Sequence, residues 1–452
     1  MGSSQRIAPA AVFTALAVGC ADDTCPAGSV VGLDGLCHLV DTGPDTSPGP
    51  SHGLVVDLDP DFIAHLQTLS PMPAPPPSPS NRVADHPGAV ELGRTLFYES
   101  RFSKSGELSC ASCHAPELAF GDAIPVAFGE ELYPRNTNSL INVAYYDWFL
   151  WDGGCDAIWC QAPRPLENRH EMNANRMEMA HLVSADPQLA ASYEAVFGPL
   201  PDLTDHTRFP DTARPDHLDP HGTLNTNWEA MSHTDQVVVN TIFANLAKSL
   251  EAYQRTLIST ASPFDTFIEG LADQDPTRLS ALSPEAQRGL VLFFGKADCV
   301  ACHDGPLLTS DQFVNVGLDT RPWLLYEDNG RWEAVEDLLE DTFTASGPYS
   351  DAPEWGAERV ADLQQSPDLQ ATFRVPSLRN VSRTGPYMHG GHFDTLAEVI
   401  QHYNTLDEAV FEGVRDERLV PLGLTDTEVA ELEAFLVALE LEPAADEQVP
   451  AP

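Results

Sequence analysis

The chain has 452 residues, of which 42% are apolar, and this length and composition predict two or three globular domains with full hydrophobic interiors. It carries 24 basic and 68 acidic residues, which give a formal net charge of -44. Such an excess of negative charge argues against nucleic acids and anionic membrane surfaces as partners, and favours a basic protein partner. A surface adapted for solubility or for high salt would show the same acidity.

The N-terminus has the pattern of an export signal. A single basic residue, Arg6, precedes a weakly apolar stretch over residues 7–18, and Cys20 follows it. The stretch is too short for a spanning helix, and residues 1–19 resemble a signal peptide of the lipoprotein type. We therefore expect a periplasmic protein, with Cys20 as a candidate lipid attachment point at the outer membrane.

Residues 20–83 are rich in Cys, Pro and acidic residues, a composition that predicts an extended tether. Folded domains are expected over residues 84–282 and 283–442, with a short tail over 443–452. Within the second domain, the acidic stretch over residues 305–373 shows no pattern that assigns it a structure.

Strand signals are scarce and helical periodicity is clear, so the predicted fold is mostly α. The longest apolar helical pattern runs through Val239, Ile242, Phe243, Leu246, Leu250, Tyr253 and Leu257. Ser283 with Pro284 predicts the start of one helix, and the capping box of Thr425 and Glu428 predicts the start of another.

Two segments carry the Cys-x-x-Cys-His pattern of covalent haem attachment, with the cysteines Cys110, Cys113, Cys299 and Cys302 followed by His114 and His303. Two thiols at this spacing reach the two vinyl groups of one haem, and the adjacent histidine supplies an axial nitrogen to its iron. A single copy would also suit a redox pair or half a zinc site. Two copies favour two covalently bound haem c groups in two cytochrome c-like domains packed together.

The two attachment segments have similar approaches. Gly93, Leu96 and Phe97 precede the first, and Gly289, Leu292 and Phe293 precede the second, which indicates an internal duplication.

Four other cysteines lie in two close pairs. Cys25 with Cys37 and Cys155 with Cys160 are consistent either with disulfides in an oxidising compartment or with free buried thiols.

Further motifs make the chain resemble the bacterial dihaem cytochrome c peroxidase/MauG family over roughly residues 88–440. They are Leu92 to Phe97, Ser109 to His114, Pro134 to Asn136, Leu150 to Gly153, Glu171 with Met172, and Pro376 to Asn380. The resemblance implies an oxidoreductase that reduces hydrogen peroxide with electrons from a small periplasmic cytochrome or copper protein. A variant of the same chemistry is MauG-like oxidation of side chains on a protein substrate.

The resemblance also implies roles for residues around the first haem. His114 is then the proximal iron ligand and Glu171 the distal acid-base group, a task that suits a carboxylate. His170 is a second acid-base candidate, and Gln161 and Pro165 match positions that line the distal pocket.

Many peroxidases of the family place a histidine ligand just before the Pro-Arg-Asn run, but no histidine occurs between His114 and His170. The corresponding loop is residues 127–133. We therefore expect a first haem that is five-coordinate or water-bound. Trp151 matches a tryptophan that lies between the two haems and can relay an electron.

For the second haem, His303 is the expected proximal ligand and Tyr403 the expected sixth ligand. Tyr403 lies fourteen positions after His389, where MauG-type enzymes carry a tyrosine. Met388, His392 and His402 compete with it. The resemblance also implies one calcium ion, held by oxygen atoms of Asn136, Thr384 and Pro386, as calcium requires.

Two other classes of function are compatible with the sequence. A non-catalytic dihaem electron-transfer cytochrome would have two six-coordinate irons, and a disulfide or zinc scaffold would bind no haem.

Overall fold

The computed structural model describes residues 29–31, 37–39, 53–318, 328–406 and 413–443. In this part of the chain the protein is mostly helical, as predicted. The helices are α1 (Pro60–Leu66), α2 (Pro87–Phe97), α3 (Cys110–Cys113), α4 (Ile158–Gln161), α5 (Pro163–Glu167), α6 (Arg176–Ala185), α7 (Pro187–Phe197), α8 (Thr223–Ala230), α9 (His233–Gln254), α10 (Pro263–Asp273), α11 (Pro276–Leu279), α12 (Pro284–Phe294), α13 (Arg331–Glu340), α14 (Pro353–Val360), α15 (Leu396–Thr405) and α16 (Asp426–Val437). The strands are β1 (Ser29–Val31), β2 (Cys37–Leu39), β3 (Phe313–Val314) and β4 (Phe373–Arg374), which form two antiparallel pairs, β1 with β2 and β3 with β4.

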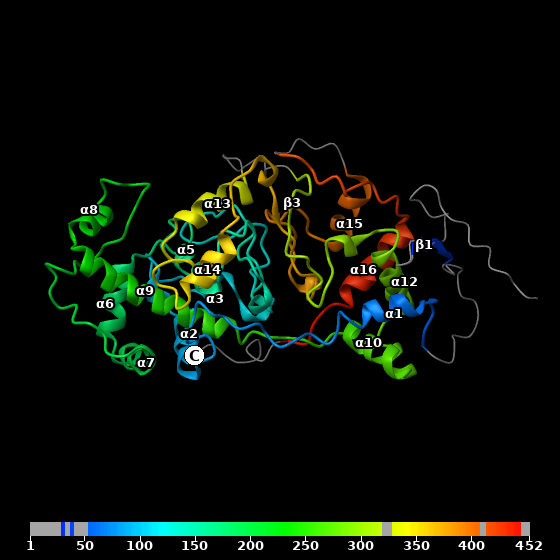
Figure 1. The fold of residues 1–452 in the computed structure, drawn as a ribbon, viewed down its shortest axis with the longest axis horizontal. Coiled ribbons are helices and arrows are strands. Elements are labelled where there is room, and N and C mark those ends of the chain that lie inside the picture. Colours follow the sequence, from blue (N-terminus) through cyan, green and yellow to red (C-terminus); the bar gives the residue numbers. More distant parts are fainter. Residues whose placement is uncertain (1–28, 32–36, 40–52, 319–327, 407–412, 444–452) are drawn as a thin grey trace, which may run out of the picture.

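Two crossed helix pairs organise the molecule, α2 with α9 in one half and α12 with α16 in the other (Figure 1). A glycine permits each crossing. A Cβ atom on Gly93 would lie 1.8 Å from the carbonyl oxygen of Ser249, and one on Gly289 would lie 1.9 Å from that of Glu431. The duplication seen in the sequence is therefore a duplication of helix packing, in which the small residue lets two backbones approach closely.

The predicted helix starts agree with the structure. The Ser283 side chain caps α12, and the Thr425 and Glu428 side chains form a capping box at the start of α16. The long apolar pattern lies in α9, whose buried face carries most of those residues.

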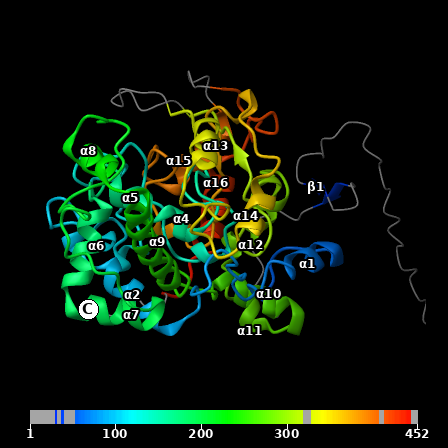
Figure 2. The same ribbon diagram turned by 60° about the vertical axis from the view of Figure 1, so that its left-hand side comes forward.

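From Gly53 onward, the N-terminal segment packs on the folded protein and is not the extended tether that was predicted. Helix α1 lies beside α10 and α12 in both views (Figure 1, Figure 2), and Leu66 and Leu69 are fully buried in the second core. The Val55 amide donates to Gln287 Oε1 at 2.8 Å. Composition predicted an extended chain here, but its few apolar residues suffice to dock it.

The proline-rich run continues from the second half of the molecule to the first. Tyr145 Oη donates to the Pro73 carbonyl oxygen at 2.9 Å, and Trp159 Nε1 donates to Ser80 Oγ at 3.0 Å. Residues 53–82 are thus a strap that contacts both halves.

The acidic stretch that sequence left unassigned belongs mainly to the first half. Figure 1 shows helices α13 and α14 in the half that contains α5 and α9. Phe343 and Ala345 lie between these two helices in the sequence and are buried in the first core, and Ala345 N donates to Asp156 Oδ1 at 2.9 Å. The second half is therefore not one continuous segment over 283–442, because residues 331–363 pack on the core of the first half.

The predicted signal peptide, Cys20 and Cys25 lie outside the described residues, as does the tail from residue 444. In the part of the chain that the structure describes, no helix has the length and apolar character needed to cross a membrane.

Candidate dihaem active site

The first attachment segment opens onto a cavity of about 370 Å³. Its walls bring together residues that are far apart in the sequence. Those predicted from sequence are Cys113, His114, Asn136, Trp151, Gln161, Pro165 and Glu171. The long segment between α3 and α4 supplies His114, Asn136 and Trp151, the short helices supply Cys113, Gln161 and Pro165, and Glu171 follows α5.

Both expected proximal histidines are oriented in the same way. The ring nitrogen Nδ1 of His114 donates to the Phe120 carbonyl oxygen at 3.0 Å, and that of His303 donates to the Leu308 carbonyl oxygen at 3.0 Å. Each bond holds the ring and leaves Nε2 as the nitrogen able to bind iron. Burial lowers the pKa of His114, and that of His303 to about 4, so both rings are neutral, as iron ligation requires.

The attachment cysteines also fit covalent haem. Burial raises the pKa of the Cys110 thiol and of the Cys299 thiol to about 12. Neither is therefore an activated thiolate of the kind found in redox enzymes. Cys113 lines the first cavity, and Cys299 and Cys302 line the second.

Glu171 faces the first cavity, next to Asn168. The Asn168 amide donates to Glu171 Oε2 at 2.8 Å. Burial raises the pKa of the Glu171 carboxyl to about 7, although the Asn168 hydrogen bond and the positive charge of Arg135 act in the opposite direction. A carboxyl group that titrates near neutrality can both accept and return a proton.

His170 does not share this environment. It is absent from the cavity wall, and its Nδ1 lies 3.2 Å from a carboxylate oxygen of Glu131 on the outer loop. Of the two acid-base candidates, only Glu171 is placed to act on a ligand in the cavity.

The loop over residues 127–133 closes one side of the first cavity, through Ala127, Gly129 and Tyr133. Among the described residues that line this cavity, His114 is the only imidazole. The five-coordinate or water-bound state of the first haem stays a prediction, and this wall is compatible with it.

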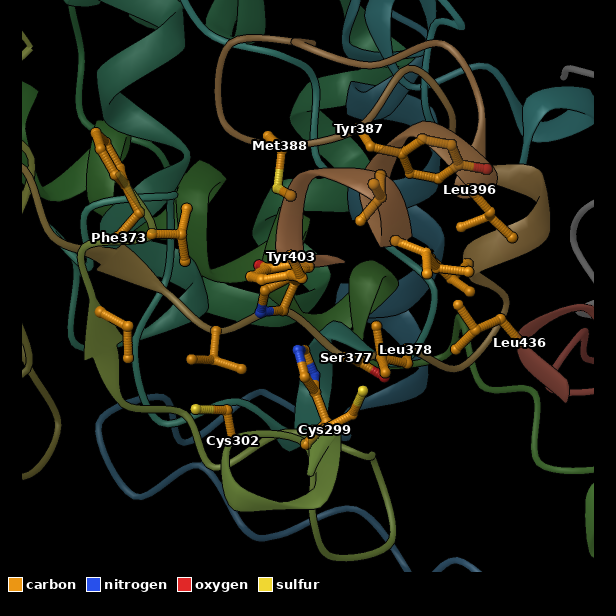
Figure 3. A pocket seen from close by; sticks show the side chains of 18 of the residues that line it. Cys299, Cys302, Phe373, Ser377, Leu378, Tyr387, Met388, Leu396, Tyr403 and Leu436 are labelled. Atoms are coloured by element: carbon orange, nitrogen blue, oxygen red, sulfur yellow. The ribbon is translucent and has the colours of Figure 1, made fainter. Parts of the chain in front are cut away.

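The second attachment segment opens onto another cavity of about 370 Å³, lined by Cys299, Cys302 and His303. Tyr403, on α15, reaches into it above the two cysteines, and Met388 lies farther from them in the same view (Figure 3). Burial raises the pKa of the Tyr403 phenol, as do the neighbouring Cys299 and Cys302 thiols.

The other sixth-ligand candidates are placed differently. His392 and His402 do not line the cavity, and His402 Nε2 donates to the Val316 carbonyl oxygen at 3.0 Å. His389, which served only to locate Tyr403 in the sequence, does line it and stacks on Phe373 with ring centroids 3.7 Å apart.

Trp151 belongs to the walls of both cavities. Its Nε1 donates to the Asn136 carbonyl oxygen at 2.8 Å, and its own carbonyl oxygen accepts from the Arg374 amide at 2.7 Å. Two backbone segments thus hold the indole between the two sites, as the relay hypothesis requires.

Comparison with known proteins gives the family of the chain. Residues 87–273 match the family model of di-haem cytochrome c peroxidase. Cytochrome-c peroxidase IdrP1 of Denitromonas iodatirespirans is 33% identical over 395 residues, which cover 84% of this chain and 88% of that protein. The chain belongs to the dihaem cytochrome c peroxidase family.

Other relatives include both MauG-type proteins and diheme peroxidases. The methylamine utilization protein MauG of Methylorubrum extorquens is 30% identical over 79% of this chain and 80% of its own length. A solved structure of a MauG-like protein associated with microbial copper homeostasis has a TM-score of 0.56 and 25% identity, over 82% of this chain and 94% of that one. The diheme peroxidase BthA of Burkholderia thailandensis shares the fold, with a TM-score of 0.57 and 20% identity, over 81% of this chain and 90% of that one.

The family implies that this dihaem peroxidase is an oxidoreductase that uses hydrogen peroxide and carries two c-type haems. The reading as a haem-free disulfide or zinc scaffold is therefore set aside. Among the described residues, no cluster of three or more His, Cys, Asp or Glu side chains suited to a metal ion occurs.

Sequence reasoning missed Arg374, which lines both cavities of the peroxidase. Its guanidinium lies 3.8 Å from the Tyr146 ring centroid and pairs with Asp311 at 3.3 Å, and its buried Nε has no protein partner. An unmatched buried donor between two haem cavities suits the anionic propionate groups that a haem carries. Its position just before the Pro376 to Asn380 motif was the available signal.

Asn136, Thr384 and Pro386, the expected calcium ligands, all line the second cavity. The Asn136 amide nitrogen donates to the Ile124 carbonyl oxygen at 3.0 Å, which leaves its oxygen as the end able to bind a cation. These three residues could offer a calcium ion only uncharged oxygen atoms. The calcium ion itself stays a prediction.

Cys155 and Cys160 are both fully buried in the first core and are free thiols in this structure. Whether they join in an oxidising compartment stays a prediction. Cys37 lies in β2, and its predicted partner Cys25 lies outside the described residues.

Proposed function

We propose that the protein reduces hydrogen peroxide at the haem attached to Cys110 and Cys113, with electrons that arrive through the second haem. The observation that carries this proposal is the placement of Glu171 in the same cavity as His114, with no second imidazole in the described wall. His114 would hold the iron of a haem bound in this cavity, and that haem would supply the electrons that break the O–O bond of peroxide.

The role of Glu171 is proton transfer. Its carboxylate takes a proton from the peroxide oxygen nearer the iron and delivers it to the farther oxygen, which then leaves as water. Gln161 and Asn168 line the same cavity, and Asn168 orients the Glu171 carboxylate.

Trp151 is the proposed relay for electrons between the two haems. Its indole is part of both cavity walls and is held by hydrogen bonds at the ring and at the backbone. Orientation by two segments favours efficient transfer, since it needs no movement of the ring.

The proposed electron donor is a small periplasmic cytochrome or copper protein. The net charge of -44 would speed the encounter with a basic partner. This proposal includes export, with a lipid anchor at Cys20, which fractionation of cells and mass spectrometry of the mature N-terminus would test.

A calcium ion at Asn136, Thr384 and Pro386 is part of the same proposal. Elemental analysis of the purified holoprotein measures it, and a calcium content near zero would remove it.

Tyr403 is the proposed sixth ligand of the second haem, because it reaches over Cys299 and Cys302 while His392 and His402 do not line the cavity. An anionic oxygen ligand stabilises the ferric state, whereas a thioether favours the ferrous state. Tyr403→Met is therefore expected to raise the reduction potential of the second haem by on the order of 0.1 V, measured by spectroelectrochemical titration. Met388→Leu is the matched control, and a larger shift in the control than in Tyr403→Met would reject the assignment.

A second candidate function is MauG-like, peroxide-dependent oxidation of side chains on a partner protein. Two observations favour it, the place of Tyr403 and the loop over residues 127–133 without histidine. An oxidised residue found in a co-purified partner would support it over the use of a soluble electron donor.

The reaction with peroxide is expected to depend on pH through Glu171. Because burial raises the pKa of this carboxyl to about 7, it is protonated and inactive as a base below that pH and ionised above it. The second-order rate of the reaction with peroxide should therefore rise with pH through about 7, in stopped-flow measurements. Glu171→Gln should show a flat profile, and an unchanged profile in that variant would assign the titration to another group.

The first experiment is the electron paramagnetic resonance spectrum of the oxidised holoprotein, followed by addition of peroxide without prior reduction. One high-spin and one low-spin haem, with an immediate spectral change on addition, support an open first haem. Two low-spin haems that react only after partial reduction would instead indicate a reductively activated peroxidase. Indifference to peroxide in both states would leave a dihaem electron carrier and overturn the proposal.

A further inference from the structure

Tyr133 lies in the wall of the first cavity together with Glu171, although its position in the sequence had suggested only the absence of a histidine. The loop that carries it is a small hairpin, in which Phe128 and Leu132 form an antiparallel bridge and the Tyr133 amide donates to the Ala127 carbonyl oxygen at 2.9 Å.

The hairpin is fastened to the backbone of the acid-base residue itself. The Glu130 amide donates to the Glu171 carbonyl oxygen at 2.7 Å, and the Glu131 amide donates to the His170 carbonyl oxygen at 2.9 Å. A Cβ atom on Gly129 would lie 2.4 Å from the Glu171 carbonyl oxygen, so the two segments are in direct contact. Backbone hydrogen bonds thus hold Tyr133 and Glu171 in the same cavity wall.

The surroundings of Tyr133 favour loss of an electron together with a proton. Burial raises the pKa of the Tyr133 phenol, so the phenol enters any reaction in its neutral form. The positive charge of Arg135 lowers this pKa, and the negative charges of three carboxylates raise it further, those of Glu171, Asp152 and Asp328. Arg135 forms ion pairs with Asp152 and Asp328. Of the three carboxylates, Glu171 is therefore the one that forms no ion pair with Arg135. A neutral phenol loses an electron readily only when a nearby base takes its proton.

We propose that Tyr133 is a redox-active residue of the peroxide pocket, which gives one electron to the first haem site during peroxide reduction and its proton to Glu171. The inference rests on the proposed function, since it needs peroxide to react at this haem. Reduction of hydrogen peroxide to two waters takes two electrons and two protons. The phenol supplies one of each and becomes a neutral phenoxyl radical. A haem bound by His114 would supply the other electron, and solvent supplies the other proton.

Tyr146, which lines both cavities, is less suited to this role. The positive guanidinium of Arg374 lies 3.8 Å from its ring centroid, which opposes removal of an electron from the ring. Its hydroxyl oxygen accepts a hydrogen bond from the Ser377 amide at 3.2 Å, a donor that cannot take a proton.

The test uses the holoprotein mixed with hydrogen peroxide in the absence of any electron donor, then frozen for electron paramagnetic resonance. Wild type is expected to show a narrow phenoxyl signal, which changes shape when the protein contains ring-deuterated tyrosine. Tyr133→Phe should lose this signal, retain both haems and still react with peroxide. Tyr193→Phe is the matched control, because Tyr193 is buried outside both cavities and bonded to Asn245; it should keep the signal.

A second measurement needs no variant. A nitroso spin trap added with peroxide to the wild-type holoprotein should label the peptide that contains Tyr133, located by mass spectrometry. A phenoxyl signal that persists in Tyr133→Phe, or a label found only on another tyrosine, would overturn the inference while leaving peroxide reduction intact. A haem spectrum that ignores peroxide would instead overturn the proposed function on which the inference rests.

Discussion

Replacement of Glu171 by Gln is expected to lower kcat/KM for hydrogen peroxide by about 10²- to 10⁴-fold, the range for removal of a general acid-base group. The amide keeps the size of the side chain and a hydrogen-bonding oxygen near Asn168, but it cannot take up and return a proton. Stopped-flow mixing with peroxide measures the change, and the absorption spectrum shows whether both haems are retained.

Glu131→Gln is the matched control for that experiment. Glu131 lies on the hairpin beside the cavity, but its side chain is 64% exposed and faces His170 on the outside. Its replacement should leave kcat/KM within about twofold of wild type. Equal losses in the two variants would mean that charge near the pocket matters, and not proton transfer by Glu171.

The second large effect is expected on stability, at Arg379. Its side chain is 1% exposed and forms a paired ion bridge with Asp265 at 2.8 and 2.9 Å. It also donates to the carbonyl oxygens of Leu69 in the strap and Pro306 behind the second attachment segment. One guanidinium therefore joins the strap, α10 and the loop that follows His303.

Arg379→Met is expected to lower the free energy of unfolding by about 3–5 kcal/mol, because it leaves the buried Asp265 carboxylate without its partner. Denaturant titration of the holoprotein, followed by circular dichroism, measures the change. Arg278→Met is the control, since Arg278 is 42% exposed and its ion pair with Asp273 contributes less than about 1 kcal/mol. Losses of similar size in both variants would contradict this account of Arg379.

The double variant Arg379→Met with Asp265→Leu tests the same argument from the other side. Removal of both charges should recover most of the lost stability, because the cost arises from one buried charge without its partner. If the loss of unfolding free energy in the double variant equals the sum of the losses in the two single variants, the bonds from Arg379 to the carbonyl oxygens of Leu69 and Pro306 account for most of its contribution to stability.

Local chemistry made much of the site predictable. Attachment of haem depends on five consecutive residues, and helix starts depend on three or four, so Cys110 to His114 and the caps of α12 and α16 could be identified without a structure. The glycines at the two helix crossings were visible as a repeat, but only packing shows that each makes room for a facing carbonyl group.

Long-range contacts were not predictable from the same sequence. Residues 53–82 have the composition of a tether, yet Leu66 and Leu69 are buried because the second core offers them an apolar surface. The acidic stretch that includes α13 was unreadable because its few buried residues, such as Leu338, pack on a core assembled far away in the chain.

The sequence by itself determined the mostly helical class and the candidate haem ligands His114 and His303, because these depend on residue type at short spacing. It also carried the resemblance to the family, and that resemblance made Glu171 the acid-base candidate. Only the tertiary structure decided that His170 is not part of the cavity wall, that Arg374 and Trp151 line both cavities, and that Tyr133 shares a wall with Glu171. The physical reason is that burial and charge at a site are set by segments that meet only when the chain is folded.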